Sequence, residues 1–166
     1  TPFSYETYVS RGGYVALTGA LEKLGPSGVK NAVKSSGLRG RGGAGFPTWK
    51  KWEMVIQQSE KKRYLCCNAA EDEPGTFKDR YLLRSNPHQL IEGVLLAAFA
   101  TGADEAYLFI NCRYKEELQF MEEALQAAKT HGHWGERSKS GITLKICRSP
   151  GSYVAGEETA LLEVIE

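Results

Sequence analysis

A glycine-rich stretch at residues 37–48 contains the residue types best suited to hold a phosphorylated ligand. Five of the nine residues from 37 to 45 are glycines, and glycine lets backbone N–H groups approach an anion or a flat ring where a side chain would collide. Phe46 adds an aromatic face on which a base can stack. The basic residues in and after the stretch are Arg39, Arg41, Lys50 and Lys51. Flexible linkers are usually rich in glycine and serine instead, so the pattern favours a ligand-binding loop.

Two familiar phosphate-binding motifs do not fit this loop. Gly40, Gly42 and Gly45 match the string G-x-G-x-x-G, but the dinucleotide fingerprint requires a strand before it, and residues 27–36 read as a helix. The P-loop also fails, because Phe46 stands where its lysine should be. A nucleotide-hydrolysing domain is therefore disfavoured.

Polar and acidic residues follow the first predicted strand, residues 63–68. They are Asn68, Glu71, Asp72 and Glu73. At the carboxyl end of a strand, such side chains can accept hydrogen bonds from hydroxyls or an amide of a nucleotide. A solvated loop, whose charges are balanced by Lys78 and Arg80, is the alternative, and the segment alone does not decide between the two.

A third unusual segment, residues 151–159, follows the last predicted strand. Its acidic residues Glu157 and Glu158 lie where a helix begins, and carboxylates in a first helical turn complement the helix dipole. Capping is thus the simplest interpretation of this pair. The H-x-H formed by His131 and His133 has no nearby carboxylate or thiol, so no metal site is assigned. The sequence also lacks the pattern G-x-S-x-G of a serine nucleophile.

Composition is that of one ordinary globular domain. The chain has 166 residues, 42% hydrophobic and 25% charged, with a net charge of +1. This balance indicates neither a nucleic-acid partner nor direct membrane insertion. No signal peptide is visible, and the start at Thr1 suggests that upstream residues are missing. Cys66, Cys67, Cys112 and Cys147 show no C-x-x-C spacing, which predicts reduced side chains in a cytosol-like compartment.

Strands alternate with helices along most of the chain, which predicts an α/β fold with a parallel sheet covered by helices on both faces. Ligands bind at the carboxyl ends of the strands in such sheets. The expected strands are residues 63–68, 105–111 and 142–147. The expected helices are residues 16–24, 27–36, 49–59, 78–84, 88–101, 114–130 and 156–166.

Three segments in a fixed order are more specific than any one alone. They are GLRGRGGAGFPT at 37–48, N-x-x-E-x-E-P-G-T-F-K-D-R at 68–80 and G-x-Y-V-x-G-E-E-T-A-L at 151–161. Together they closely resemble the NADH-binding flavoprotein subunit (51 kDa type) of respiratory complex I and the related diaphorase subunits of NAD-linked hydrogenases and formate dehydrogenases. The resemblance implies a Rossmann-like parallel sheet flanked by helices, the N-terminal part of the family's FMN-binding domain. It divides the chain into an N-terminal helical segment, 1–36, and an incomplete FMN/NADH-binding α/β domain, 37–166.

The resemblance also assigns cofactor-binding residues. The loop that would wrap FMN and admit the nicotinamide comprises Gly40, Arg41, Gly42, Gly43, Ala44, Gly45 and Phe46, with Phe46 stacking on adenine. Lys51, Asn68 and Glu71 would contact FMN, and Glu73 would contact NADH. The residues that would line the flavin are Tyr153, Gly156, Glu157, Glu158 and Thr159. Glu158 is the residue assigned to catalysis, as a carboxylate that opposes negative charge on the reduced flavin.

The function that this implies is an NADH:acceptor oxidoreductase module that takes hydride from NADH onto FMN. Single electrons would then pass to an iron–sulfur cluster outside this chain. A [4Fe–4S] cluster is expected in the missing C-terminal part of the subunit. Expected partners are iron–sulfur subunits of the same complex, including a small thioredoxin-like [2Fe–2S] subunit, in the cytoplasm, at the cytoplasmic face of a membrane complex or in the mitochondrial matrix.

Two departures from the family pattern keep a second hypothesis open. Ala70 replaces an expected aspartate, and Met54 stands where a second adenine-stacking aromatic often lies. The alternative is an FMN-binding assembly or docking module without NADH chemistry. Addition of NADH to the flavin-loaded protein without oxygen separates the two hypotheses.

Overall fold

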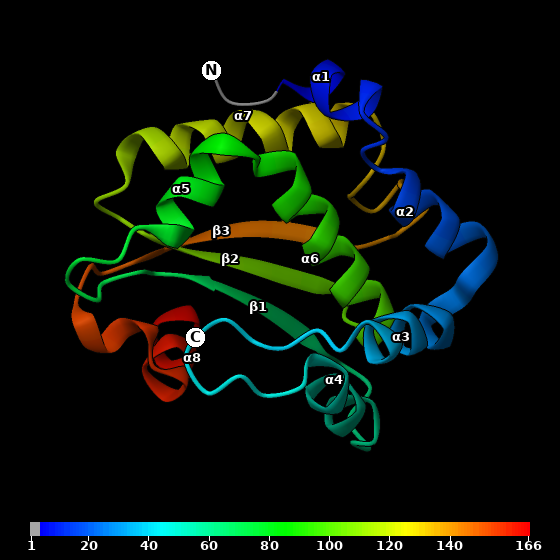
Figure 1. Cartoon of the computed structure of the whole chain (residues 1–166), viewed down its shortest axis with the longest axis horizontal. Coiled ribbons are helices and arrows are strands. Elements are labelled where there is room, and N and C mark those ends of the chain that lie inside the picture. The colour runs from blue at the N-terminus through cyan, green and yellow to red at the C-terminus, as the bar shows by residue number, and fades with distance from the viewer. Residues whose placement is uncertain (1–3) are drawn as a thin grey trace.

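A three-stranded parallel sheet forms the centre of the computed structural model, which describes residues 4–166 (Figure 1). The strands β1 (Tyr64–Ala69), β2 (Glu105–Asn111) and β3 (Thr143–Ser149) lie in the order β1-β2-β3. Asn68 pairs with Phe109, and Phe109 pairs with Cys147. All three strands therefore end at the same edge of the sheet, and the predicted α/β class is confirmed.

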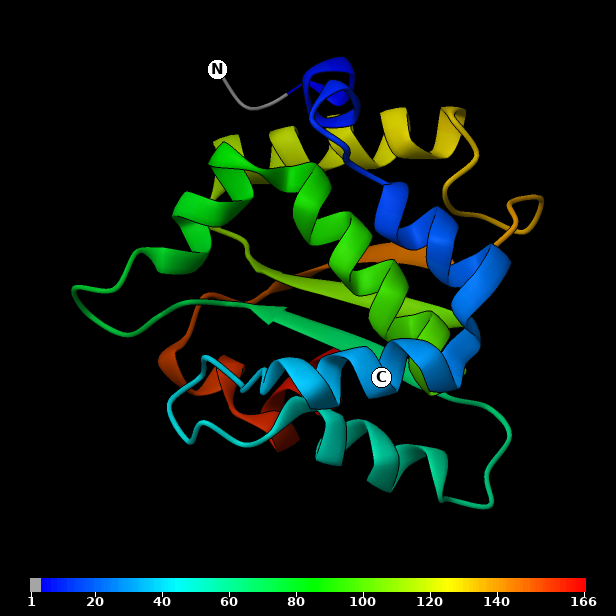
Figure 2. The ribbon, with the colours of Figure 1, turned by 45° about the vertical axis from the view of Figure 1, so that its right-hand side comes forward.

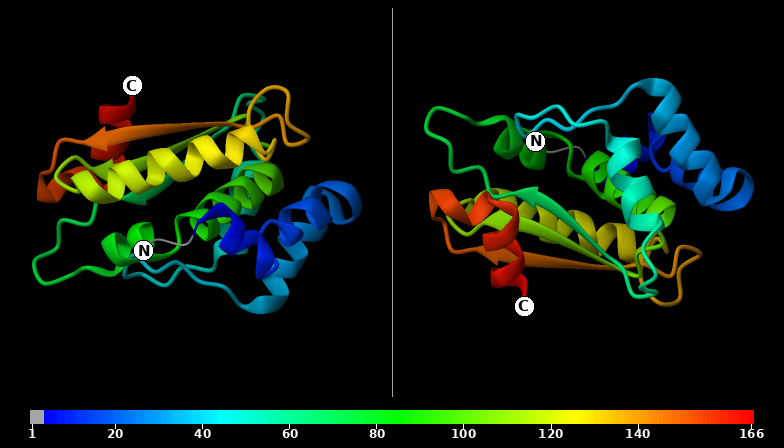
Figure 3. Two further views of the ribbon diagram at one scale, coloured as in Figure 1. Left: turned by 90° about the horizontal axis from the view of Figure 1, so that it is seen from above. Right: turned by 90° about the horizontal axis from the view of Figure 1, so that it is seen from below.

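Helices cover one face of this sheet fully and the other face in part. The helices α5 (Lys78–Ser85), α6 (Pro87–Thr101) and α7 (Lys115–Thr130) lie over the first face, where Leu108 and Ile110 join the main core (Figures 1 and 3). On the second face, Phe109 is fully buried and packs against Leu161 of α8 (Glu158–Ile165). Lys145 stays exposed on that second face. The helical cover expected on both faces is thus complete on one face only, within residues 4–166.

The N-terminal helices build a layer beyond α6. They are α2 (Val15–Gly19), the π-helical turn η1 (Ala20–Leu24), α3 (Gly25–Ser36) and α4 (Thr48–Ile56). Val29 of α3 and Trp52 of α4 cluster with Ala100 of α6. This packing fixes both ends of the glycine-rich loop, which crosses the molecule between α3 and α4 toward α8 (Figure 2). The predicted helices agree with the observed ones within a few residues.

The 3-10 turn η2 (Tyr153–Gly156) was not predicted from the sequence, and neither was the helix α1 (Tyr5–Ser10). Ser4 caps its first turn by accepting a hydrogen bond from the backbone N–H of Thr7, at 3.2 Å. The helix is held by a cluster of tyrosines and histidines. The Tyr5 hydroxyl lies 2.8 Å from Nε2 of His133, and the Tyr8 ring stacks on His88 at 5.8 Å between centroids. Both tyrosine rings also pack against the ring of Tyr14. Because so short a helix has little stability of its own, these contacts from distant segments hold it in place.

This cluster predicts a loss of stability in mild acid. Burial, reinforced by neighbouring histidines, lowers the pKa of His88 and of His133 below the ordinary value of 6.5. Both side chains prefer to be neutral when folded, so the unfolded chain takes up protons first as the pH falls below 6.5. The stability present above that pH is then lost as the pH falls toward the folded-state pKa values. Thermal unfolding should show a lower Tm at pH 5.5 than at pH 7.5.

Histidine-to-glutamine variants isolate the source of this effect. His88→Gln and His133→Gln should each reduce the difference in Tm between the two pH values, because each removes one of the titrating groups. An unchanged pH dependence in both variants would contradict the assignment to this cluster.

No helix formed by residues 4–166 combines the length and apolar character needed to cross a bilayer.

Candidate cofactor cleft

An open cleft of about 840 Å³ lies at the carboxyl edge of the sheet. We call it the strand-end cleft. The residues that line it come from the glycine-rich loop, from the segment after β1, from the start of α5 and from the segment after β3. They are Arg41, Gly42, Gly43, Asn68, Ala70, Glu71, Asp72, Glu73, Thr76, Lys78, Asp79, Tyr153, Val154, Gly156 and Glu157. Segments far apart in the sequence thus converge on one cavity.

The glycine-rich loop reaches the cleft as a narrow hairpin. At its base, the Gly40 N–H donates to the Phe46 carbonyl at 2.9 Å and the Thr48 N–H donates to the Leu38 carbonyl at 3.1 Å. Gly43 has a φ of +118°, which side-chain-bearing residues rarely adopt. A Cβ placed on Gly42 would meet no atom of residues 4–166 within 4 Å, apart from its chain neighbours. The tip of the hairpin therefore presents bare backbone to the cleft, as binding of a flat ring or a phosphate requires.

Asn68 joins two walls of the cleft. Its Nδ2 donates to the Gly156 carbonyl at 2.8 Å, and its Oδ1 accepts from the Ala70 N–H at 3.1 Å. Across the cleft, the Glu73 carboxylate raises the pKa of the Tyr153 hydroxyl by hydrogen bonding with it. The segments after β1 and β3 are therefore linked by side chains as well as by the sheet.

Glu71 has a structural partner within the protein. Its side chain is 2% exposed, and its carboxylate accepts from the backbone N–H groups of Asp79 and Arg80 at 3.1 and 3.3 Å. The carboxylate thereby caps the start of α5, where the helix dipole also favours negative charge. Glu71 consequently lines the cleft while holding the helix that bounds it.

Replacement of Glu71 should therefore destabilise the fold. We expect Glu71→Ala to lower the free energy of unfolding by about 1–2 kcal/mol, because buried N–H groups lose a charged acceptor. Glu73→Ala is the matched control, since Glu73 is exposed in the same segment and should cost less than about 0.5 kcal/mol. Equal midpoints for the two variants in urea unfolding would rule out the capping role.

The acidic pair at the start of α8 separates into two roles. Glu157 caps the helix by accepting from the Thr159 and Ala160 N–H groups at 3.1 and 3.2 Å, and these bonds lower its pKa. Capping is thus confirmed for Glu157. The Glu158 carboxylate instead extends into solvent, 3.9 Å from the Lys51 ammonium of α4. Since so exposed a pair adds little stability, both charges remain available to a ligand.

Nine of the residues predicted from the sequence line the strand-end cleft: Arg41, Gly42, Gly43, Asn68, Glu71, Glu73, Tyr153, Gly156 and Glu157. The other seven predicted residues are not among its lining residues: Gly40, Ala44, Gly45, Phe46, Lys51, Glu158 and Thr159. The remaining lining residues are Ala70, Asp72, Thr76, Lys78, Asp79 and Val154. The family resemblance assigned none of these six to a cofactor, although Asp72 was among the strand-end carboxylates suited to hydrogen bonding with a nucleotide. For Asp72 and Lys78, the sequence signal that could have indicated a place in the cleft is their position after β1.

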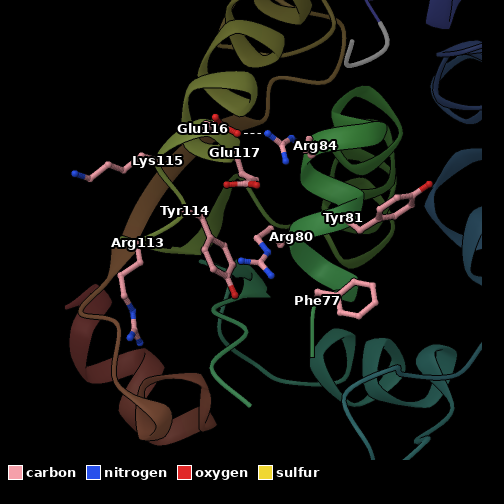
Figure 4. A pocket seen from close by; sticks show the side chains of 9 residues that line it. All are labelled: Phe77, Arg80, Tyr81, Arg84, Arg113, Tyr114, Lys115, Glu116 and Glu117. Carbon is pink, nitrogen blue, oxygen red and sulfur yellow. Dashed lines mark hydrogen bonds and ion pairs between the residues drawn. The ribbon is translucent and has the colours of Figure 1, made fainter. Parts of the chain in front are cut away.

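A second hollow, of about 490 Å³, lies between α5 and α7 (Figure 4). Its lining mixes aromatic, basic and acidic side chains, and Arg84 forms an ion pair with Glu116 there. Arg80, Arg113 and Tyr114 also line a smaller hollow of about 310 Å³, which reaches Glu71 and Asp72 of the strand-end cleft. The two hollows and the cleft therefore adjoin one another along the same edge of the sheet.

Residues 33–166 match the model of a protein family described as the Nuo51 FMN-binding domain of the 51 kDa complex I type. The chain belongs to this family. The match begins near the end of α3 and includes the hairpin and all three strands. The resemblance inferred from the three sequence segments is thereby confirmed.

Relatives in the Nuo51 family are close to this chain in sequence. It is 47% identical over 163 residues to an F-type subunit (number 2) of the NADH-quinone oxidoreductase of Rhizobium meliloti (strain 1021), covering 96% of this chain and 39% of that protein. It is 45% identical over 166 residues to the corresponding F-type subunit of Aquifex aeolicus (strain VF5), covering 98% of this chain and 38% of that protein. The chain thus spans less than half the length of these relatives.

A solved structure of an NAD⁺-reducing [NiFe]-hydrogenase in the H2-reduced state supports the same fold. It matches with a TM-score of 0.79 at 39% identity, covering 98% of this chain and 26% of that chain. The air-oxidized state matches 85% of this chain and 24% of that one, with a TM-score of 0.77 and 44% identity. Proteins similar to this chain thus include subunits of NADH-quinone oxidoreductases and an NAD⁺-reducing [NiFe]-hydrogenase.

Proposed function

We propose that this chain binds FMN and NADH in the strand-end cleft and brings them together for hydride transfer. The observation that carries the proposal is the convergence of the Gly42 hairpin tip, Asn68 and Glu157 on one cavity. The cavity, about 840 Å³, is of the size expected for a cofactor site. FMN supplies the chemistry when bound, by accepting a hydride and releasing electrons one at a time.

The protein residues contribute binding and orientation. Backbone N–H groups at the hairpin tip and the guanidinium of Arg41 suit the phosphate. Asn68 and Glu73 offer polar groups to hydroxyls, and the cleft walls would orient the two cofactors for hydride transfer. Glu158 places a negative charge beside the site and so opposes further negative charge there. We assign contacts with the same cofactors to the neighbouring residues Gly40, Ala44, Gly45, Phe46, Lys51 and Thr159.

The relatives support a proposal for the larger complex in which the chain acts. Their names describe subunits of NADH-quinone oxidoreductases, and the chain spans about 39% of the first of them. We propose that electrons leave toward a [4Fe–4S] cluster in a C-terminal part of the subunit. Partner iron–sulfur subunits, including a thioredoxin-like [2Fe–2S] subunit, would receive them at the cytoplasmic or matrix side of a complex. The division of the chain at residues 36 and 37 also stays a prediction.

Anaerobic titration of the FMN-loaded protein with NADH tests the proposal. We expect the visible absorbance of the flavin to bleach at about one NADH per FMN. Bound flavin that does not bleach would favour the docking module without NADH chemistry. Failure to bind FMN after reconstitution would refute both functions.

A further inference from the structure

One arginine joins the segments that follow all three strands. Arg113 lies just after β2, and its guanidinium extends toward the segment after β3 (Figure 4). Its Nη2 donates to Oδ1 of Asp72, in the segment after β1, at 2.5 Å and to the Gly151 carbonyl, in the segment after β3. A single side chain therefore connects the two walls that carry most of the lining of the strand-end cleft.

Asp72 depends on this contact. Its side chain is 5% exposed, and the same Oδ1 also accepts from Nδ2 of Asn111 at 2.7 Å. Its Oδ2 is buried and has no hydrogen-bond partner among residues 4–166. A carboxylate this buried is unfavourable without a counter-charge, and Arg113 provides the positive charge in direct contact with it. Loss of the guanidinium would thus leave a buried carboxylate without its counter-charge and drive Asp72 toward solvent.

The other wall is built to let the guanidinium approach. Gly151 has a φ of +76°, and a Cβ there would lie 3.1 Å from Nε of Arg113 and 3.2 Å from Sγ of Cys112. Since real Cβ atoms rarely lie so close to other atoms, a side chain at Gly151 would displace the arginine. The Tyr114 hydroxyl makes a second connection to the segment after β1 by donating a hydrogen bond to the Glu71 carbonyl. The segment after β2 thus holds its neighbours on both sides.

We propose that Arg113 is a positioning residue that sets the width of the strand-end cleft through Asp72 and Gly151. The segment after β1 carries Glu73, and the segment after β3 carries Tyr153 and Glu157, all of which line the cleft. Arg113 itself is not among the lining residues of that cleft. It therefore acts on the cofactors through the two segments that it connects. This inference rests on the proposed binding of FMN and NADH.

The test compares FMN affinity and the rate of flavin reduction by NADH in the purified, FMN-loaded protein and its variants. Arg113→Gln should raise the FMN Kd and lower the reduction rate at saturating NADH, each by about 10- to 100-fold, as expected for small misplacements of binding groups. Arg113→Lys should give intermediate values, because it keeps the charge but cannot bind both partners as the guanidinium does. Arg148→Gln is the matched control. Arg148, on β3, forms an exposed ion pair with Glu122, on α7.

A second variant separates positioning from simple loss of stability. Asp72→Asn combined with Arg113→Gln removes the buried charge as well as its partner, and it should recover part of the affinity that Arg113→Gln alone loses. If Arg113→Gln alone fails to fold, the double variant is compared with the wild type in the same two measurements. Equal Kd values and rates for Arg113→Gln and Arg148→Gln, in protein that NADH still bleaches, would overturn the inference. Wild-type protein that NADH does not bleach would instead overturn the proposed function.

Discussion

Replacement of Gly42 by valine is expected to abolish tight FMN binding while leaving the fold intact. Beyond its chain neighbours, a Cβ at this position meets no atom within 4 Å in the part of the chain that the structure describes, and the φ of Gly42 lies outside the left-handed region. The fold therefore tolerates a side chain, but the branched side chain would occupy the space assigned to the ligand. A clash of about 3 kcal/mol corresponds to an increase of more than about 100-fold in the FMN Kd. Quenching of flavin fluorescence on binding measures the change.

A glycine elsewhere provides the control for this variant. Gly93 lies in α6, and a Cβ there would also meet no described residue within 4 Å beyond the backbone of its own helix. Gly93→Ala should leave the FMN Kd unchanged and should slightly stabilise the helix. The circular dichroism spectrum of Gly42→Val should match that of the wild type. Unchanged FMN affinity in a folded Gly42→Val protein would show that the hairpin tip does not contact the flavin.

Replacement of Glu92 by leucine should cause the largest loss of stability. Glu92 is 6% exposed in α6, and its carboxylate accepts from the backbone N–H groups of Tyr14 and Leu17 at 2.8 and 3.0 Å. It also accepts from the Tyr8 hydroxyl at 2.5 Å. The variant leaves these buried donors without an acceptor, which should cost about 3–5 kcal/mol. Urea unfolding should show a lower midpoint with an unchanged slope.

Two further variants test whether the lost hydrogen bonds cause this effect. Glu92→Gln keeps one acceptor oxygen and should cost clearly less than Glu92→Leu. Glu123→Ala, in the exposed face of α7, should change stability by no more than about 0.5 kcal/mol. If Glu92→Leu and Glu123→Ala unfolded at the same urea concentration, the N-terminal helices would not depend on the Glu92 carboxylate.

The sequence predicted those parts of the fold and site whose signal is local. Hydrophobic runs and glycine stops located the three strands and most of the helices. The glycine-rich loop and Asn68 were assigned to the site from local signals. Glycine permits close approach of the backbone to a ligand, and polar residues at strand ends lie where ligands bind in parallel sheets. The dual role of Glu71 was missed, since nothing near it in the sequence shows that it caps α5.

Features that depend on distant partners could not be predicted in this way. Helix α1 has only a few residues, and its side chains contact Tyr14, His88 and His133 from three other segments. The role of Arg113 likewise appears only when the ends of the strands meet. No periodicity or spacing in the sequence connects Arg113 with Asp72 or Gly151.

A crystal structure of the protein with FMN bound tests the central claim most directly. We expect density for the flavin ring and the phosphate within the strand-end cleft, in contact with Gly42 and Asn68 and near Glu157. Density for FMN in the hollow between α5 and α7, or on any surface away from the hairpin tip, would contradict this claim.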